Sequence, residues 1–417
     1  MNPMKTRSAS TMSEMFHMPR ARTAIEKLWQ VPWVLLAVVA LLSAIGSTTL
    51  YSVAGGNAQP WAETHALRFL MAAALVLCMA MVPLRVWSAI AYPAYAVALL
   101  MLILVPVFGV QALGAKRWLS FGGFSVQPSE LMKVGLVLAL ARYYQMLEPG
   151  EVSWPRRVLV PGLLIAVPVL FVLVQPDLGT AALFAGLGLT LMFLAGVSSW
   201  YFIAGGIGLG AALPLIWNSL HDYQRRRVEI FMDPDMDPLG SGYHITQSKI
   251  ALGSGGFSGK GFLQGTQSQL DFLPEKQTDF IFTMFSEEWG FVGALGLLFL
   301  YAVLLSLLMS MALRASTPFS RLLIGGSAMT MFLYIFINVA MVTGLVPVVG
   351  VPLPFVSYGG TALTTLMVGL GLAMSAHVHR DEPLANGLGP FATQMRNRIR
   401  DRWHYRGEMP LDRLWRR

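Results

Sequence analysis

Charged side chains and cysteine are scarce in this sequence, and each shortage excludes a class of protein. Only 12% of the 417 residues are charged, whereas about a quarter of the residues of an ordinary soluble domain are. Cys78 is the single cysteine, which excludes an internal disulfide framework and a cysteine-based metal site. The first thirty residues show no secretory signal peptide, so we expect the first apolar run to remain as a membrane span.

Apolar residues take the place of the missing charges. Hydrophobic residues make up 55% of the chain, and the mean hydropathy is +0.58. Runs of about 20 residues, long enough to cross a bilayer, recur along the sequence. They predict an all-α integral membrane protein with about ten transmembrane helices. The predicted spans are Val31–Val53, Ala66–Val82, Trp87–Phe108, Pro128–Tyr144, Val158–Val174, Gly179–Val197, Trp200–Trp217, Phe280–Leu313, Leu322–Leu345 and Gly360–Val378.

The basic residues predict the orientation of these spans. We divide the chain into a tail of residues 1–30, a transmembrane domain of residues 31–378 and a basic tail of residues 379–417. With ten spans, the lysines and arginines of both tails and of most short connections fall on one side, which should be cytoplasmic. Both termini are then cytoplasmic. The long segment of about 218–279, between helices seven and eight, becomes an extracytoplasmic loop whose mixed composition predicts order.

The formal net charge of +8 does not indicate nucleic-acid binding, because the basic residues gather in the tails and short loops. We expect the arginine-rich segment 396–417 to meet solvent or anionic membrane lipids. Residues 254–261, SGGFSGKG, lack the glycine and the final serine or threonine of a phosphate-binding loop. No metal-ligating residues are predicted.

The fourth span opens with VQPSELMKVG, which places charges at the mouth of a membrane helix. Pro128 suits the first turn of a helix, and Glu130 and Lys133 follow on one face. Two interpretations stay open: a pair that only neutralises itself, or the wall of an outward-facing pocket that holds a cation against an anionic ligand. Gln127 and Arg117, just before the span, are further candidates for binding that ligand.

Spans six and ten also begin with polar or helix-breaking residues. The stretch VQPDLGT places Asp177 at the start of span six, either as a helix cap or as part of the same pocket. The stretch VPLPFVSYGGT precedes span ten, contains two prolines and adds Ser357. Broken backbone at membrane depth is tolerated where it lines a cavity, so Ser357 is another candidate for ligand binding.

The stretch QSQLDFLPEKQTDFIF carries three carboxylates before span eight. Asp279 stands at the outer mouth of the helix, where a carboxylate is costly and therefore indicates function. We expect Glu275 in the adjoining loop, where it can help to position a ligand, and Asp271 at the surface. One of Glu287 and Glu288, deeper in the span, should have a structural partner.

Five ordered blocks of this sequence resemble the SEDS family (shape, elongation, division, sporulation), and the resemblance covers most of the chain. The blocks are GAKRWLSFGGFSVQPSELMK, QPDLGT, GYHITQSKIALGSGGFSGKG, LPEKQTDFIF with EEWG, and MVTGLVPVVGVPLPFVSYGG. The stretch GTQSQLDFLPEKQTDF is closer to the rod-shape members than to the division members. Gln277, Trp289 and Thr361 depart from the residues common in the family.

The resemblance implies a peptidoglycan glycosyltransferase for cell elongation and rod shape. It would polymerise lipid II at the outer face of the bacterial inner membrane, with Asp279 as catalytic residue, facing Glu130 and Lys133. It also implies a partner, a class B penicillin-binding protein that acts as transpeptidase, and further proteins of the elongation complex. No cofactor is certain; a divalent cation such as Mg²⁺ can assist such a transfer, but no motif demonstrates one.

Two other functions suit the same residues. A lipid II flippase would use the same pocket without chemistry, since transporters often combine broken helices with a site at the bilayer midplane. A non-catalytic scaffold of a cell-wall complex would use none of the polar groups for a reaction. The clustering of the polar groups near the outer ends of the spans favours an enzyme of the outer face.

Overall fold

The computed structural model describes the chain from residue 23 to residue 382 with short gaps. The described residues are 23–112, 115–121, 124–175, 177–219, 222–233, 236–237, 240–270, 272–273 and 275–382. Most of both predicted tails, and also Asp271, lie outside the described residues, so the expectations for them stay predictions.

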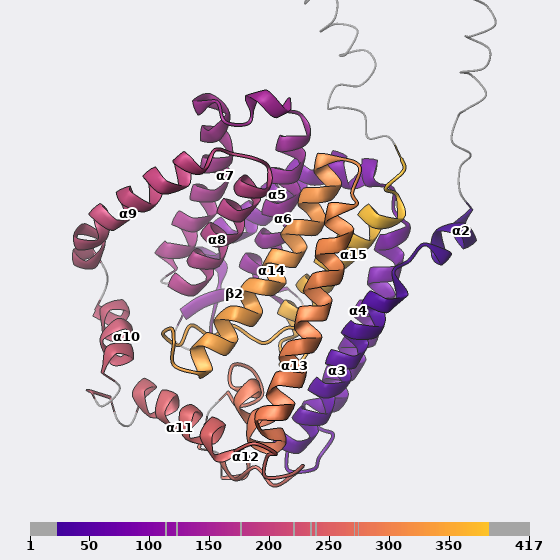
Figure 1. The fold of residues 1–417 in the computed structure, drawn as a ribbon. Helices are drawn as coiled ribbons and strands as arrows, with labels where there is room; N and C mark the ends of the chain where they lie inside the picture. The colour runs from indigo at the N-terminus through magenta and orange to yellow at the C-terminus, as the bar shows by residue number, and fades with distance from the viewer. Residues whose placement is uncertain are drawn as a thin grey trace, which may run out of the picture.

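Each of the ten predicted apolar runs forms a helix (Figure 1). The short helix α2, Ala24–Trp29, precedes them. The ten helices are α3 (Trp33–Val53), α4 (Ala62–Met81), α5 (Leu84–Phe108), α6 (Pro128–Gln145), α7 (Pro155–Val174), α8 (Leu178–Leu194), α9 (Ser199–Ser219), α13 (Ile281–Leu313), α14 (Pro318–Val342) and α15 (Gly360–Val378). The prediction of a mostly helical membrane protein is confirmed.

Seven of these helices, within the described part of the chain, are long and apolar enough to cross a membrane. They are α3, α4, α5, α7, α13, α14 and α15. Helix α8 is shorter, as is the apolar part of α9, and α6 carries Glu130, Lys133 and Arg142 in its 18 residues. The number of ten crossings therefore stays a prediction.

Helices α6 and α14 form the centre of the bundle. Most residues of α6 are buried, as are those along much of α14, and α14 packs against α6, α8, α13 and α15 (Figure 1). A helix that is buried nearly all round needs no amphipathic pattern. The charged residues near the start of α6 are therefore enclosed by protein instead of facing lipid.

The two ends of the described chain lie side by side. Lys27 of α2 lies 2.9 Å from the Nε2 atom of His379, just after α15, and 3.8 Å from a carboxylate oxygen of Glu382. The start of α3 and the end of α15 therefore lie on the same side of the bundle, as an even number of crossings requires.

Helix α13 is interrupted at Gly290, whose φ of 65° is not helical. The loop of residues 256–261 pairs with the backbone groups at this break. Phe291 and Val292 donate their N–H groups to the carbonyls of residues 256 and 257, and the N–H groups of residues 260 and 261 donate to the carbonyls of Glu287 and Glu288. These four hydrogen bonds give partners to main-chain groups at the break, as burial away from water requires.

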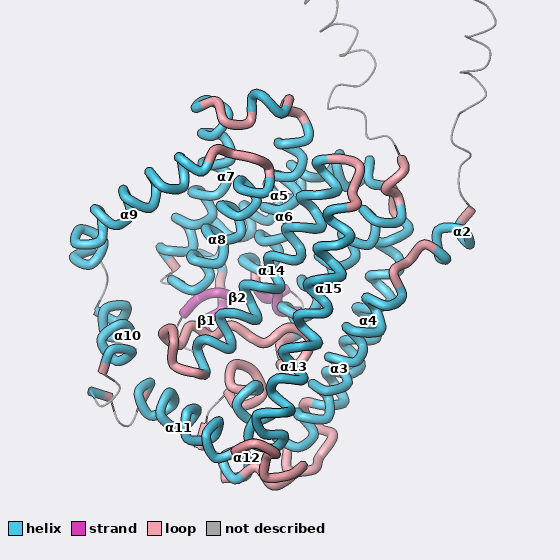
Figure 2. The backbone as a smooth tube through the Cα atoms, viewed as in Figure 1, coloured by secondary structure: helices cyan, strands magenta, loops and turns pink. Residues whose placement is uncertain are grey.

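A small antiparallel sheet corrects the expectation of an exclusively helical chain. Its strands are β1 (Val110–Ala112), β2 (Ala115–Phe121) and β3 (Phe124–Val126), in the order β1-β2-β3 (Figure 2). It lies between α5 and α6, where the sequence analysis expected only a loop with two basic residues. The run AKRWLSF does not alternate apolar and polar side chains, so the period that marks a strand was not available to predict it.

The predicted long loop contains three helices. They are α10 (Asp222–Met232), α11 (Ser241–Ser254) and α12 (Thr266–Gln269). Helices α11 and α12 lie at the end of the molecule opposite the turn between α6 and α7 (Figure 1). The start of α9 packs against the bundle through Tyr201 and Phe202, and the rest of the helix extends away from it (Figure 1). Its exposed large apolar side chains are Trp200, Ile203, Ile207, Leu209, Leu213, Leu215 and Trp217.

Candidate functional site

Asp279 lies in a tight turn immediately before α13. The turn starts at Glu275, which has a left-handed φ of 55°. Its carbonyl accepts the N–H groups of Thr278, Asp279 and Phe280, and its carboxylate accepts the Thr278 hydroxyl at 3.1 Å. Glu275 therefore shapes the turn that carries Asp279. Its predicted contact with a ligand stays a prediction.

Three successive carbonyls of this turn are held from outside. The N–H of Tyr358 donates to Gln277 at 2.8 Å, the hydroxyl of Ser357 to Thr278 at 2.6 Å, and the side-chain amide of Asn338 to Asp279 at 2.9 Å. The main chain around Asp279 is thus fixed by the broken segment before α15 and by α14.

The Asp279 carboxylate lies over a glycine of the same broken region. A Cβ atom built on Gly350, whose φ is +74°, would lie 3.2 Å from the Oδ2 atom. Glycine at this position gives the carboxylate room and lets the backbone turn with positive φ.

A second polar group lies inside the bundle. The Lys133 ammonium donates to Glu130 at 2.6 Å, and the Tyr334 hydroxyl lies 2.7 Å from both carboxylate oxygens of Glu130. The ammonium also contacts the Tyr334 hydroxyl. All three side chains are buried. The self-neutralising pair of the sequence analysis is therefore present, with Tyr334 as a third member.

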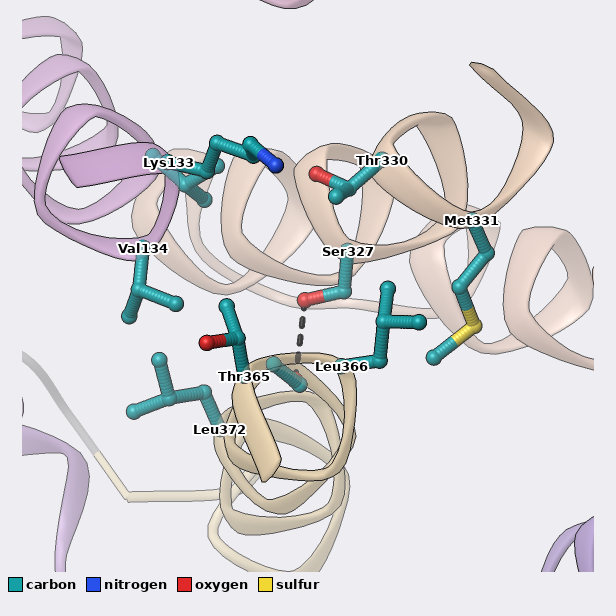
Figure 3. A pocket seen from close by; sticks show the side chains of 10 residues that line it. Lys133, Val134, Ser327, Thr330, Met331, Thr365, Leu366 and Leu372 are labelled. Atoms are coloured by element: carbon teal, nitrogen blue, oxygen red, sulfur yellow. Dashed lines mark hydrogen bonds between the residues drawn. The ribbon is translucent and has the colours of Figure 1, made fainter. Parts of the chain in front are cut away.

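Lys133 also lines a small, mainly apolar cavity. Its ammonium points toward Thr330 of α14, while Ser327 bonds to α15 (Figure 3). The volume of this cavity is about 20 Å³, which is room for about one water molecule. In this conformation, the cavity is too small for a phosphate group beside Lys133.

Arg117 and Asp177 form a third group. The Nε atom of Arg117, on β2, lies 3.4 Å from the Oδ2 atom of Asp177. Asp177 also accepts the N–H and the hydroxyl of Thr180, so it caps α8 as one interpretation predicted. Helix α8, which Asp177 caps, packs against both α6 and α14. This pair therefore lies at the start of a helix that neighbours the Glu130–Lys133–Tyr334 group.

Helix α14 connects the second group to the Asp279 turn. Tyr334 and Asn338 are four residues apart and so lie on one face of the helix, about 6 Å apart along its axis. The sequence analysis missed both. The available signal was their polarity within the apolar run of residues 322–345, since polar groups inside a membrane helix are usually functional or paired.

The other predicted ligand-binding residues have structural contacts of their own. Gln127 directly precedes α6, and its carbonyl accepts the N–H of Glu130. Ser357 is buried, and besides its bond to Thr278 it accepts the N–H of Leu353 at 2.7 Å. Ser357 thus holds the Asp279 turn to the broken segment. Direct contact of either residue with a ligand stays a prediction.

Both deeper glutamates have structural partners, where one was expected. Glu287 is fully buried and accepts the Lys260 ammonium at 2.5 Å together with the N–H groups of Thr266 and Gln267. Glu288 accepts the hydroxyl of Ser52. Lys260, in the segment of residues 254–261, therefore anchors this loop to α13.

His244 of α11 lies beside the same turn, with its ring 6.5 Å from that of Phe280. Burial lowers the pKa of His244 below its usual 6.5, against the opposing effect of the Asp237 carboxylate. The imidazole is therefore neutral at pH 7 and adds no positive charge next to Asp279. Among the described residues, no group of three or more histidine, cysteine, aspartate or glutamate side chains could hold a metal ion.

Known proteins resemble this chain in both sequence and fold. Residues 26–382 match the FtsW/RodA/SpoVE family of cell cycle proteins. The chain is 44% identical to the peptidoglycan glycosyltransferase MrdB of Escherichia coli K12 over 366 residues, which cover 87% of this chain and 97% of MrdB. It is 34% identical to the probable peptidoglycan glycosyltransferase FtsW of Trichlorobacter lovleyi, over 84% of this chain and 93% of FtsW.

Two solved structures resemble the fold. One, described as the structural coordination of polymerization and crosslinking by a peptidoglycan synthase complex, contains a chain with 33% identity and a TM-score of 0.72, over 85% of this chain and 99% of that one. The other is the rod shape determining protein RodA of Thermus thermophilus, with 28% identity and a TM-score of 0.63, over 85% and 98%. The chain belongs to the FtsW/RodA/SpoVE family of cell cycle proteins, the SEDS family that its motifs resemble.

Proposed function

We propose that this chain, a peptidoglycan glycosyltransferase like the relatives named above, polymerises lipid II with Asp279 as the general base. The observation that carries the proposal is the support of the Asp279 turn. Three successive carbonyls are fixed from two other segments, and one of these segments, α14, also contacts Glu130 and Lys133. Such fixed orientation is what a group that must meet a reacting atom requires.

The reaction needs one proton acceptor and one stabilised leaving group. The acceptor 4-hydroxyl of N-acetylglucosamine attacks the anomeric carbon of the donor sugar, while its proton passes to the Asp279 carboxylate. The new C–O bond forms as the bond to phosphate breaks, and the electron pair leaves with undecaprenyl diphosphate. A positioned base typically contributes 10²–10⁴-fold to such a step.

Arg117 is the cation best placed for the diphosphate. Its side chain is 26% exposed, whereas that of Lys133 is 3% exposed. We assign Arg117 to direct contact with phosphate and Lys133 to holding Glu130 in the core. The helix N-termini near this face add partial positive charge. The described carboxylates do not gather into a metal site, so no step is routed through a divalent cation.

We propose that the chain crosses the bacterial inner membrane ten times with both termini in the cytoplasm. The contact between Lys27 and Glu382 supports an even number of crossings. The basic connections support the orientation. Asp279 and the segment of residues 218–279 then face the periplasm. A class B penicillin-binding protein is the proposed partner, because a structural relative comes from a peptidoglycan synthase complex.

The test is polymerisation of purified lipid II by the purified chain, with Asp279→Asn and Asp279→Ala as variants. Glu148→Gln is the control, since this exposed carboxylate lies at the other end of the bundle. We expect losses of about 100-fold or more for both Asp279 variants and none for the control. Full polymerisation by Asp279→Asn would exclude the general-base role. Translocation of lipid II in liposomes without any glycan strands would instead support a flippase.

A further inference from the structure

Asn338 is an amide in an apolar helix, and its surroundings show what it does. It lies in the stretch MFLYIFINVAMV of α14 and is 0% exposed. A buried amide costs free energy unless its hydrogen bonds are made. In a membrane helix such a group usually has a function or a specific partner.

The amide uses both of its protons on two separate segments. Its Nδ2 atom donates to the carbonyl of Asp279 at 2.9 Å and to the carbonyl of Val351 at 2.7 Å. Because both partners are acceptors, the amide must present its nitrogen to them. The Oδ1 atom has no hydrogen-bond partner in the described part of the chain. The donating end of Asn338 therefore makes both of its side-chain hydrogen bonds.

These two segments flank the Asp279 carboxylate. One is the turn of residues 275–280, which carries the carboxylate. The other contains Gly350, the residue over which the Oδ2 atom lies, followed by Val351. Neither segment belongs to a continuous helix. Asn338 ties both to α14, which packs against five other helices and so serves as a fixed reference.

We infer that Asn338 is a positioning residue that fixes the direction of the Asp279 carboxylate through the main chain on both sides of it. This inference rests on the proposed role of Asp279 as base. Asn338 itself touches neither sugar nor phosphate. Loss of its donors lets the turn and the Gly350 segment shift, and a misplacement of about 1 Å at a reacting group can cost 10²-fold in rate.

The test compares three substitutions of Asn338 in lipid II polymerisation. Asn338→Asp keeps the shape and loses the amide protons, Asn338→Leu keeps roughly the volume, and Asn338→Gln keeps both protons on a longer arm. Ser375→Ala is the control, because Ser375 is also 0% exposed and donates to a main-chain carbonyl, that of Val82, at the opposite end of the bundle. The readouts are kcat, KM and the midpoint of thermal unfolding.

We expect kcat to fall at least tenfold for Asn338→Leu and Asn338→Asp at nearly unchanged KM, with partial recovery in Asn338→Gln. The control should lose stability but keep kcat. A kcat that falls only in proportion to the folded fraction, or a change confined to KM, would overturn the inference. A variant that shows no thermal unfolding transition is not folded and is left out of the comparison. The kcat and KM of Asn338→Gln, the mildest change, then test the inference by the same criteria.

A double variant separates this inference from the proposed function. If Asn338 acts through Asp279, adding Asn338→Leu to Asp279→Asn should cause little further loss, because residues that act as a unit are not additive. Full activity of Asp279→Asn would refute the base itself. Inactive Asp279→Asn beside fully active Asn338 variants would refute only the positioning role. Losses that multiply in the double variant would also refute it.

Discussion

The Tyr334 hydroxyl is the group that contacts both charges of the Glu130–Lys133 pair. A buried pair of charges is costly unless its remaining hydrogen-bonding positions are filled. Tyr334 fills one on the carboxylate and one on the ammonium, and its ring lies 4.4 Å below the ammonium. This phenol therefore keeps two charges stable in the bundle centre, one turn away from Asn338.

Tyr334→Phe is expected to lower both stability and activity. The ring remains, but Glu130 and Lys133 each lose a hydrogen bond, and a buried polar group left unpaired costs about 1–3 kcal/mol. We expect polymerisation to fall about tenfold or more, because the pair no longer keeps its geometry under the site. Initial rates and thermal unfolding measure the two effects.

Tyr95→Phe is the matched control for this substitution. Tyr95 donates to the carbonyl of Leu164 at 2.9 Å between α5 and α7, so its hydroxyl is not part of the Glu130–Lys133–Tyr334 group. It should lose stability and keep its rate. Equal rates for the two variants at equal folded fraction would show that Tyr334 has only a structural role.

The charged residues of this site could be predicted from the sequence, whereas its neutral polar residues could not. Glu130, Lys133, Asp177 and Asp279 stand out because a charge in an apolar sequence is costly. The contacts of Asn338 cross 59 residues to Asp279, and no local pattern encodes such a contact. The sequence analysis expected Ser357 to face a ligand because it could not show that two main-chain groups occupy the hydroxyl.

Two interrupted elements build the site at the level of secondary structure. Helix α13 breaks at Gly290, and the segment 351–359 before α15 is not helical. Each break is held by residues distant in the sequence. The loop of residues 256–261 bonds to the break in α13. In the segment before α15, His65 donates to the carbonyl of residue 355 and Tyr301 to that of residue 354. Loops of this kind place side chains where a continuous helix could not.

Gly290→Ala tests the first interruption. Its φ of +65° and ψ of −166° belong to a region that is essentially restricted to glycine. A Cβ atom there would lie 2.2 Å from the nitrogen of Gly259 and 2.7 Å from the carbonyl oxygen of Phe257. We expect a loss of about 2 kcal/mol or more in unfolding free energy, and a loss of activity as the loop detaches.

Gly296→Ala is the control on the same helix. Nothing lies within 4 Å of a Cβ atom built at this position, so its unfolding free energy should not fall and should rise by about 0.5–1 kcal/mol, the usual advantage of alanine over glycine inside a helix. If Gly290→Ala unfolds at the same temperature as Gly296→Ala, the break is not required for the fold.

Elements made of long apolar runs were predictable, and those set by tertiary contacts were not. The ten apolar runs became ten helices because their length and hydropathy depend only on local sequence. The sheet of residues 110–126 is short, and its pairing depends on the turns between strands, so it was expected as a loop. The break at Gly290 lies inside the predicted span Phe280–Leu313. This span is compatible with one helix until the loop that pairs with the break is known.

At the scale of the whole molecule, the basic residues of the short connections lie at one end of the bundle. The short connections between α4 and α5, α6 and α7, and α13 and α14, with the adjoining helix ends and the end of α15, carry basic residues at one end of the bundle. They are Arg85, Arg142, Arg156, Arg157, Arg314, Arg321 and Arg380. The Asp279 turn, α11 and α12 lie at the other end (Figure 1). The basic residues between α5 and α6 and in the long segment between α9 and α13 are exceptions to this pattern; among them are Lys116, Arg117, Arg225, Arg226, Lys249 and Lys260. Positive charge is retained on the cytoplasmic side during insertion, so the site should face outward.

Thiol labelling of intact spheroplasts tests this orientation. Cys78, the single cysteine, is first replaced in Cys78→Ser. Ser258→Cys then places a thiol on the loop that holds α13, and Glu148→Cys places one in the turn between α6 and α7; both positions are exposed. A membrane-impermeant maleimide should label the first and reach the second only after lysis. Labelling of Glu148→Cys in intact cells, with Ser258→Cys protected, would show the opposite orientation. The site would then face the cytoplasm, away from the outer face to which lipid II polymerisation is assigned.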